Sequence, residues 1–327
     1  MLTPVCRRIA NRTGFLAHPS ARGVHQRPTP LLGGVAIFFS FLLATWIAVR
    51  VSGGAPTFGF LGGAVLIFVM GVIDDKVDLS WFSKLLGQIV AAVLLLASES
   101  DVGSFFLTPS GLVLSLFWVV GIANAMNFLD NMDGICAGIA AVVSASFVGL
   151  ALLGGQTHVA LLAAALAGAC LGFLRYNFHP ARIFLGDGGS LFLGYSLASI
   201  ALMIMRQAEF SASTVVPIVA LAYPMFDIAY VSVTRSARGQ ALTQGGKDHT
   251  SHRLARVLGG TPATAVAIYA ICVALGVVSL VLNRIAFAPA TVVACVALFC
   301  AFVGFGVRLS HAAPVPERTG SARAAVS

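Results

Sequence analysis

Long runs of apolar residues alternate with short polar segments along this 327-residue chain. A helix needs roughly 20 apolar residues to cross the hydrocarbon core of a bilayer, which is about 30 Å thick. Ten runs meet this requirement, at about 31–50, 57–73, 84–98, 111–129, 134–153, 158–176, 188–205, 213–233, 262–282 and 287–307. The pattern therefore predicts an all-α, polytopic integral membrane protein with about ten transmembrane helices.

The composition agrees with this pattern. Hydrophobic residues make up 58% of the chain and charged residues only 10%, whereas soluble domains carry about 25% charged residues. With a mean hydropathy of +0.93, a cytosolic enzyme, a disordered chain and a nucleic-acid-binding module are excluded. The six cysteines include no CxxC pair, so neither a disulfide framework nor a zinc site is expected.

The net charge of +8 mainly reports orientation, because cytoplasmic loops are enriched in Lys and Arg. Of the 20 basic residues, all but Arg50, Arg206 and Arg284 fall on one side if the N-terminus is cytoplasmic. Both termini are then cytoplasmic. The connections on the outer side are short, so polar chemistry is expected on the cytoplasmic face.

This orientation divides the chain into three parts: a cytoplasmic N-terminal segment at 1–30, a transmembrane domain at 31–310, and a cytoplasmic, disordered tail at 311–327. The first residues contain no apolar stretch of the signal-peptide type, so no signal peptide is expected. The ten runs show no obvious internal repeat, which weakens the alternative of a transporter built from repeated halves.

Most of the acidic residues fall at or near the predicted cytoplasmic ends of the spans. Carboxylates at a membrane boundary are costly and usually functional. The eight residues of this kind are Asp74, Asp75, Asp78, Asp130, Asp133, Asp187, Asp227 and Asp248.

The first cluster is the Asp74–Asp75 pair at the end of an apolar run. One interpretation is a helix stop, followed by an N-cap for the next helix at Asp78 or Ser83. The other is chemical, because paired acids hold a metal or share a proton. Lys84 could pair with an acid, hold a phosphate, or extend its charge toward the membrane surface.

In the second cluster, Asn124, Asn127, Asp130 and Asp133 recur at every third position. On a helix this spacing places four oxygen-bearing side chains roughly on one face. The cluster lies at the end of an otherwise apolar span, and a loop without a binding function would not need two asparagines inside the membrane. We therefore interpret it as a binding surface.

The third cluster places Asp187 among glycines at a predicted helix start, with Ser190 one turn later. Free N–H groups at such a start bind phosphate, and a carboxylate there can hold Mg²⁺ against it. The alternative is an ordinary N-cap. The segment is neither a Walker loop nor a Rossmann fingerprint.

The fourth cluster is His249 and His252 beside Lys247, Arg253 and Arg256. Two histidines with three cations suit a polyphosphate. A zinc pair lacks further ligands nearby, and a basic loop that binds nothing stays an alternative.

A segment before the first span also carries structural information. Pro28 and Pro30 enforce an extended chain, while Gly33 and Gly34 permit close backbone approach. By itself this segment is best interpreted as a rigid linker leading into the membrane.

Taken in order, these segments resemble the polyprenyl-phosphate N-acetylhexosamine-1-phosphate transferases, and most of all the bacterial undecaprenyl-phosphate GlcNAc-1-phosphate transferases. The resemblance covers about residues 22–310. It implies that the domain at 31–310 is catalytic, that the protein lies in the bacterial inner membrane, and that the active site faces the cytoplasm.

The resemblance also implies roles for individual residues. Asp74, Asp75 and Lys84 match the segment implicated in the lipid phosphate and the attack. Asp187, with Asn127, matches the Mg²⁺ site, where Mn²⁺ is an alternative ion. The residues matching the nucleotide-sugar site are Asn124, Asn127, Asp130, Asp133, His249, His252 and Arg253.

The expected substrates are undecaprenyl phosphate from the bilayer and a UDP-N-acetylhexosamine from the cytosol. The lipid phosphate would attack the β-phosphorus and release UMP, and a phospho-enzyme on an aspartate is an open alternative. Other open alternatives are a phospho-MurNAc-pentapeptide transferase and a membrane transporter. No nucleic-acid partner is expected, and the resemblance leaves a homodimer open.

Overall fold

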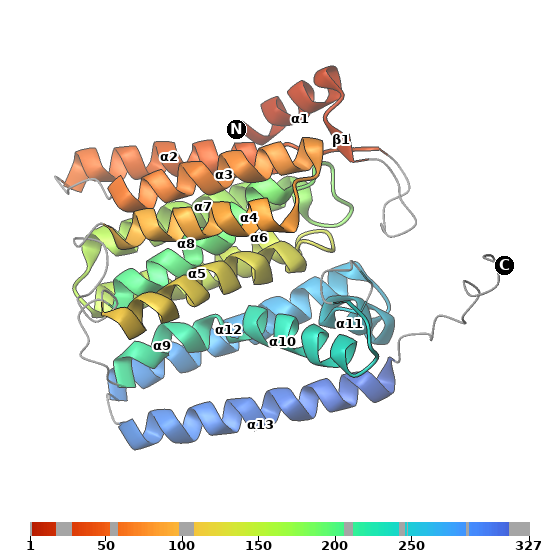
Figure 1. Cartoon of the computed structure of the whole chain (residues 1–327). Coiled ribbons are helices and arrows are strands. Elements are labelled where there is room, and N and C mark those ends of the chain that lie inside the picture. Colours follow the sequence, from red (N-terminus) through yellow and green to blue (C-terminus); the bar gives the residue numbers. More distant parts are fainter. Residues whose placement is uncertain are drawn as a thin grey trace.

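The computed structural model describes residues 2–17, 28–52, 58–97, 108–205, 212–241, 246, 248–285 and 288–313. Long helices lie side by side along one common direction (Figure 1). The expectation of an all-α, polytopic membrane protein is confirmed, because eight helices within these ranges are long and apolar enough to cross a bilayer. These are α2 (Gly33–Ser52), α3 (Phe58–Val77), α5 (Pro109–Leu129), α6 (Ile135–Leu153), α7 (Thr157–Asn177), α8 (Asp187–Met205), α12 (Thr261–Ile285) and α13 (Ala288–Ala312).

The other two expected spans have a different form. The run at 84–98 corresponds to α4 (Trp81–Leu96), a shorter apolar helix. Its N-cap is Ser80, whose Oγ accepts the Ser83 N–H at 3.1 Å, so neither residue proposed as the cap has that role.

The run at 213–233 is interrupted and forms α9 (Ala212–Ala220) and α10 (Ala222–Ser236). Pro224 explains the break. A proline has no N–H to donate to the carbonyl four residues earlier, and its ring clashes with that carbonyl. The carbonyl in question belongs to Ala220, where α9 ends.

The remaining elements gather at one end of the long helices, where α1 and α11 are seen in Figure 1. They are α1 (Leu2–Thr13), β1 (Leu16–Ala17), β2 (Thr29–Pro30) and α11 (Thr250–Leu258). The two short strands pair antiparallel. This end corresponds to the predicted cytoplasmic face.

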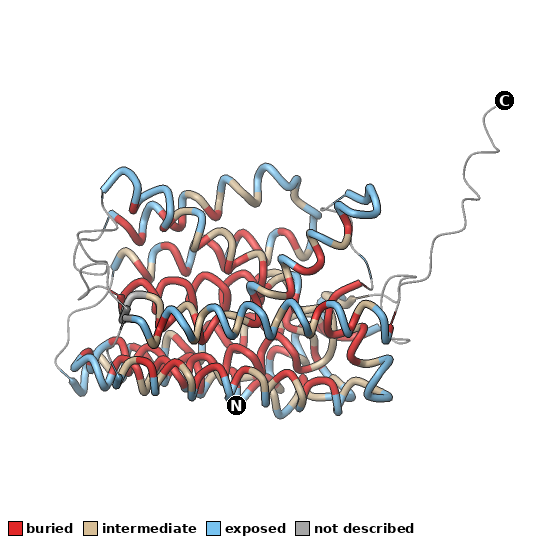
Figure 2. Tube along the Cα trace, turned by 90° about the horizontal axis from the view of Figure 1, so that it is seen from below, coloured by how far each residue is buried: buried red, intermediate tan, exposed pale blue. Residues whose placement is uncertain are grey.

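Helix α8 forms the centre of the bundle, and nearly all of its residues are buried. It packs against α2, α3, α5 and α6. Outer helices such as α13 carry exposed apolar side chains, including Val292 and Phe299, and exposed positions recur along them in Figure 2. Such apolar surfaces are favourable in contact with lipid chains and unfavourable in contact with water.

The segment before the first span does more than lead into the membrane. The Gly33 and Gly34 N–H groups donate to the carbonyls of Phe184 and Leu185 at 2.9 and 2.8 Å. A Cβ atom on Gly34 would collide with the Gly189 backbone. The expected close backbone approach is therefore confirmed, and it fixes the loop that leads into α8.

Candidate active site

Lys84, on the first turn of α4, lies between two acidic side chains. Its Nζ atom is 2.6 Å from Asp74 Oδ2 at the end of α3, and 3.8 Å from Asp187 Oδ2 at the start of α8. Asp74 also accepts the Leu79 N–H at 2.8 Å, which fixes the turn between α3 and α4. The predicted pairing of Lys84 with an acid is thus observed.

Asp75 has a different environment from its neighbour. Its Oδ1 accepts the Asp187 N–H at 2.8 Å, and its Oδ2 accepts the Gly188 N–H at 3.2 Å. A carboxylate is favourable there because the first N–H groups of a helix lack partners and carry partial positive charge. Gly186 precedes this turn with φ +78°, and a Cβ atom on it would lie 2.6 Å from Asp75 Oδ2.

Asn127, near the end of α5, connects that helix to α8. Its Nδ2 donates to Asp187 Oδ1 at 3.0 Å and to Ser190 Oγ at 2.9 Å. The structure therefore brings together the two residues that the resemblance assigns to the metal.

Asp130 caps the C-terminus of α5 beside the same carboxylates. Burial raises the pKa of Asp130 well above its usual range, and the negative charges of Asp187, Asp75 and Asp133 raise it further. Carboxylates from three helix ends thus create a strongly negative local field.

The side chains in this cluster fit a hard divalent cation. Mg²⁺ is usually held by one or two carboxylates together with substrate phosphates, so a complete protein cage is not required. Within the described ranges, no three His, Cys, Asp or Glu side chains form a ready-made ligand group. Asp187, which Lys84 connects to Asp74, supplies the type of oxygen donor that Mg²⁺ prefers.

Asn124 lies one helical turn before Asn127, and its amide group pairs with another amide. Its Nδ2 donates to Gln88 Oε1 at 2.7 Å, and Gln88 Nε2 donates back to Asn124 Oδ1 at 3.3 Å. This pair links α4 to α5 and holds Lys84 and Asn127 in register. Gln88 was not expected from the sequence, although it is a polar residue within an apolar run.

Asp133 binds the chain that follows α7. Its Oδ2 lies 2.8 Å from His179 Nδ1 and accepts the Ala181 N–H at 3.0 Å. His179 was also not expected from the sequence.

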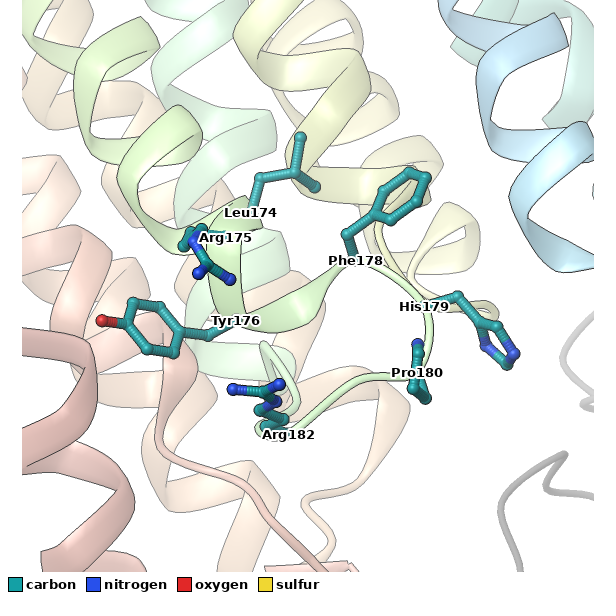
Figure 3. Close-up of a pocket in the computed structure, with 7 residues that line it drawn as sticks. All are labelled: Leu174, Arg175, Tyr176, Phe178, His179, Pro180 and Arg182. Atoms are coloured by element: carbon teal, nitrogen blue, oxygen red, sulfur yellow. The ribbon is translucent and has the colours of Figure 1, made fainter.

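The same segment borders a hollow of about 290 Å³ that Arg175, Tyr176 and Arg182 help to line (Figure 3).

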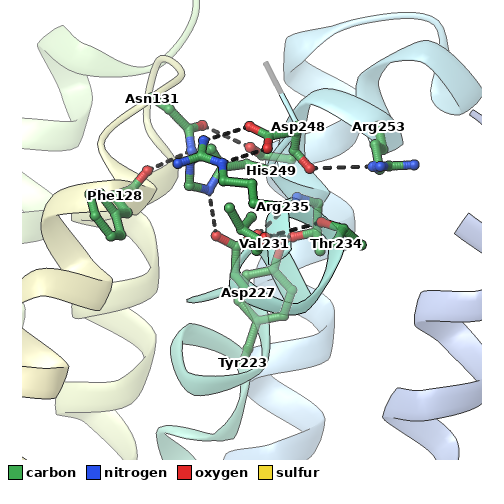
Figure 4. Close-up of polar contacts among 12 residues, drawn as sticks. Phe128, Asn131, Tyr223, Asp227, Val231, Thr234, Arg235, Asp248, His249 and Arg253 are labelled. Atoms are coloured by element: carbon green, nitrogen blue, oxygen red, sulfur yellow. Dashed lines mark hydrogen bonds and ion pairs between the residues drawn. The ribbon is translucent and has the colours of Figure 1, made fainter. Parts of the chain in front are cut away.

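His249 and Asp227 form a buried pair, shown in Figure 4, at the junction of α10 and α11. His249 Nδ1 lies 2.8 Å from Asp227 Oδ2, and the imidazole lies 6.0 Å from the Phe128 ring, measured between centroids. Ser251 Oγ donates to Asn131 Oδ1 at 2.7 Å. The start of α11 is thereby attached to the end of α5 that carries Asn127.

Arg253 lies away from this cluster. It is fully buried, donates to the carbonyls of Asp248 and Ala313, and stacks over the Tyr230 ring at 5.2 Å. Its Nη2 atom is buried without a hydrogen-bond partner among the described residues, and the assignment of Arg253 to the nucleotide-sugar site stays a prediction. His252 is half-buried on α11, and Lys247 lies outside the described residues.

A second buried ion pair holds the segment before α11. Arg235 Nε and Nη2 each donate to one carboxylate oxygen of Asp248 at 2.7 Å. Burial raises the pKa of Asp248, but the hydrogen bonds and charge of Arg235 outweigh that effect and hold the pKa below its usual value.

Comparisons with known proteins agree with this arrangement. The sequence profile of glycosyl transferase family 4 matches residues 57–205. The chain is 36% identical over 266 residues to a probable undecaprenyl-phosphate N-acetylglucosaminyl 1-phosphate transferase of Bacillus subtilis, covering 78% of this chain and 73% of the relative. It is 34% identical over 291 residues to a decaprenyl-phosphate N-acetylglucosaminephosphotransferase of Mycobacterium tuberculosis, covering 77% and 71%.

A shorter match links the chain to a second group of enzymes. A phospho-N-acetylmuramoyl-pentapeptide-transferase of Desulforudis audaxviator is 35% identical over 216 residues, covering 56% of this chain and 64% of the relative. The longer matches extend beyond the profile region to most of both chains. The chain therefore belongs to glycosyl transferase family 4, the polyprenyl-phosphate N-acetylhexosamine-1-phosphate transferases.

Proposed function

We propose that this protein transfers GlcNAc-1-phosphate from a UDP-sugar to undecaprenyl phosphate, releases UMP, and so starts a lipid-linked glycan of the cell envelope. The observation that carries the proposal is the convergence of Lys84, Asp74 and Asp187 from three helices. Phosphoryl transfer depends mainly on positioning and charge neutralisation, which this cluster supplies. The names of the relatives above support the choice of substrates.

Lys84 and the Asp74–Asp75 pair form the acceptor side of the proposed site. The lipid phosphate approaches from the bilayer, and Lys84, on the first turn of α4, offsets its negative charge. Asp74 lies close enough to Lys84 to form an ion pair with it. A phosphate monoester has a second pKa of about 6, so the attacking oxygen is already deprotonated at neutral pH and needs little base catalysis. Asp75 holds the start of α8 in place.

Mg²⁺ fits the donor side of this site. Asp187, with Asn127, would hold the ion, and Mn²⁺ has similar ligand preferences. When bound, it would supply positive charge to the donor pyrophosphate. Asn127 orients the Asp187 carboxylate through its 3.0 Å hydrogen bond. Asp130, Asp133 and His249 would contact the nucleotide sugar.

The proposed location is the inner membrane of a bacterium, with the active site on the cytoplasmic face, because the site residues lie at the basic ends of the spans. The acceptor is then drawn from the bilayer, while the donor arrives from the cytosol. A transporter would need ionisable groups near the middle of the membrane. Asp74, Asp75, Asp130 and Asp187 instead lie at the ends of α3, α5 and α8.

The test is an assay of UMP release by the purified protein in lipid vesicles. With UDP-GlcNAc, undecaprenyl phosphate and Mg²⁺, we expect UMP and a lipid-linked sugar pyrophosphate in equal amounts. Omitting the lipid phosphate is the matched control and should abolish release. Adding UDP-MurNAc-pentapeptide as a competitor separates the two branches of the family. Turnover of that donor in preference to UDP-GlcNAc would contradict the proposal.

A further inference from the structure

Asp227 has no role in the proposed reaction, yet its environment is unusual for a carboxylate. It is fully buried in α10, and the residues next to it in the sequence of this helix are mostly apolar. Burying an ionised carboxylate costs several kcal/mol unless hydrogen bonds and charge compensate for it. The position of Asp227 therefore requires specific partners.

All of these partners belong to the first two residues of the turn that begins α11. Asp227 Oδ2 contacts His249 Nδ1 at 2.8 Å, while Oδ1 accepts the Thr250 N–H at 2.8 Å and also the Thr250 hydroxyl. The Tyr223 hydroxyl, one turn earlier on α10, lies 2.9 Å from the same Thr250 oxygen. One carboxylate thus caps α11 and holds the imidazole (Figure 4).

The contact with Asp227 determines which nitrogen of His249 is free. A carboxylate accepts hydrogen bonds, so His249 must carry a proton on Nδ1. Nε2, on the far side of the ring, has no hydrogen-bond partner among the described residues and is not one of the fully buried polar atoms. It therefore stays available to a ligand.

The ring is also held against the active site. Phe128, which contacts the imidazole, directly follows Asn127 on α5. The Ser251–Asn131 hydrogen bond joins α11 to the turn that follows α5. A movement of His249 would thus be opposed from two sides. Partners of this kind fix the tautomer and orientation of metal-binding histidines, where their loss typically costs 10- to 100-fold in metal affinity or activity, and we expect a similar range for His249.

We infer that Asp227 is a positioning residue, which holds His249 with its Nε2 atom free to contact the pyrophosphate of the sugar-nucleotide donor. This inference rests on the proposed function, because it assumes a pyrophosphate donor. It assigns the Asp227–His249 pair to the donor and not to the lipid phosphate, which Lys84 serves from the other side of the cluster.

The first experiment is kinetic. Asp227→Asn should lower kcat/KM for UDP-GlcNAc by about 10- to 100-fold and leave the KM for undecaprenyl phosphate unchanged. In a His249→Ala background, the same substitution should have little further effect, because residues that act as a unit are non-additive. Equal losses in the two backgrounds, or a wild-type value for Asp227→Asn, would overturn the inference.

Thr250→Val is the matched control. It removes a hydrogen bond from the same carboxylate but leaves the contact with His249 and the Thr250 N–H in place. We expect near wild-type turnover, whereas a loss as large as that of Asp227→Asn would show that Asp227 acts only by anchoring α11. The thermal midpoint of each variant in detergent reports whether it is folded.

A second measurement does not depend on activity. Nitrogen-15 NMR of histidine-labelled wild-type protein distinguishes the two neutral tautomers, with His249→Ala assigning the signal. We expect the Nδ1–H form at His249, and the Nε2–H form would overturn the inference whatever the kinetic result. If the wild type released no UMP while NMR showed the Nδ1–H form, the proposed function would fail and the positioning of His249 would stand.

Discussion

At the scale of single residues, the central feature is a lysine shared by two carboxylates. Lys84 contacts Asp74 closely and Asp187 at a longer distance. When a phosphate binds, the lysine can exchange one of its carboxylate partners for the phosphate. It also limits mutual repulsion among acids that lie at the ends of separate helices.

Asp187→Asn tests the proposed metal ligand. The substitution preserves shape and the contact with Asn127, but it removes the negative charge that would hold Mg²⁺. A lost metal contact is worth several kcal/mol, and each 1.36 kcal/mol is tenfold in rate, so we expect turnover to fall by about 100-fold or more. The assay is UMP release, with the thermal midpoint as the control for folding. Wild-type turnover would contradict the assignment.

At the scale of elements, glycines let helices meet through their backbones. A Cβ atom on Gly71 of α3 would lie only 2.5 Å from Gly188 Cα of α8. Close approach of this kind is common in membrane helices, where small residues allow dense packing. It places the end of α3, and therefore Asp74 and Asp75, directly against the start of α8.

Gly71→Ala should therefore separate α3 from α8. Overpacking of a buried contact typically costs 1–3 kcal/mol, and we expect a lower thermal midpoint together with reduced UMP release. The matched control is Gly121→Ala on α5, where an added Cβ atom meets nothing within 4 Å. That change should leave stability equal or raise it by about 0.5–1 kcal/mol. Equal effects of the two substitutions would contradict this account.

At the scale of the whole molecule, the long helices carry the site residues to one end of the bundle. Helix α8 lies in the centre and is surrounded by other helices, so its N-terminus is reached only from that end. The apolar outer surface and the polar end thus divide the protein into a part that suits lipid and a part that suits a nucleotide.

The sidedness of the reaction follows from this division. Sealed inside-out vesicles should release UMP from added UDP-GlcNAc, whereas sealed right-side-out vesicles should not, because the donor cannot cross the bilayer. Detergent should restore activity to the right-side-out vesicles, which serves as the control for enzyme content. Equal activity in both sealed preparations would contradict a cytoplasmic site.

Much of this organisation could be predicted from the sequence. Eight of the expected spans correspond to long apolar helices, because the length and apolarity of a span are local properties. The run at 213–233 was less predictable, since its apolar composition hid the effect of Pro224 on the preceding helix. The chemical types of the site residues were also readable, because acids are costly in an apolar chain.

The different partners of neighbouring acids could not be predicted from the sequence. Asp74 and Asp75 are adjacent and identical in type, yet the first pairs with Lys84 and the second caps α8. Nor could the sequence show that the guanidinium of Arg253 is buried beside the Ala313 carbonyl and the Tyr230 ring. Adjacent residues on a helix point in directions about 100° apart, so their partners depend on which helices pack on each side.

The sequence by itself determined the membrane class and the set of polar residues at one end of the helices, and it predicted an orientation, because each depends on local composition and charge. Only the tertiary structure decided which of those residues meet. Asp75 and the start of α8 are separated by more than 100 positions in the chain, and His249 reaches Asp227 from another helix. Contacts of this kind arise from helix packing, in which the whole chain takes part.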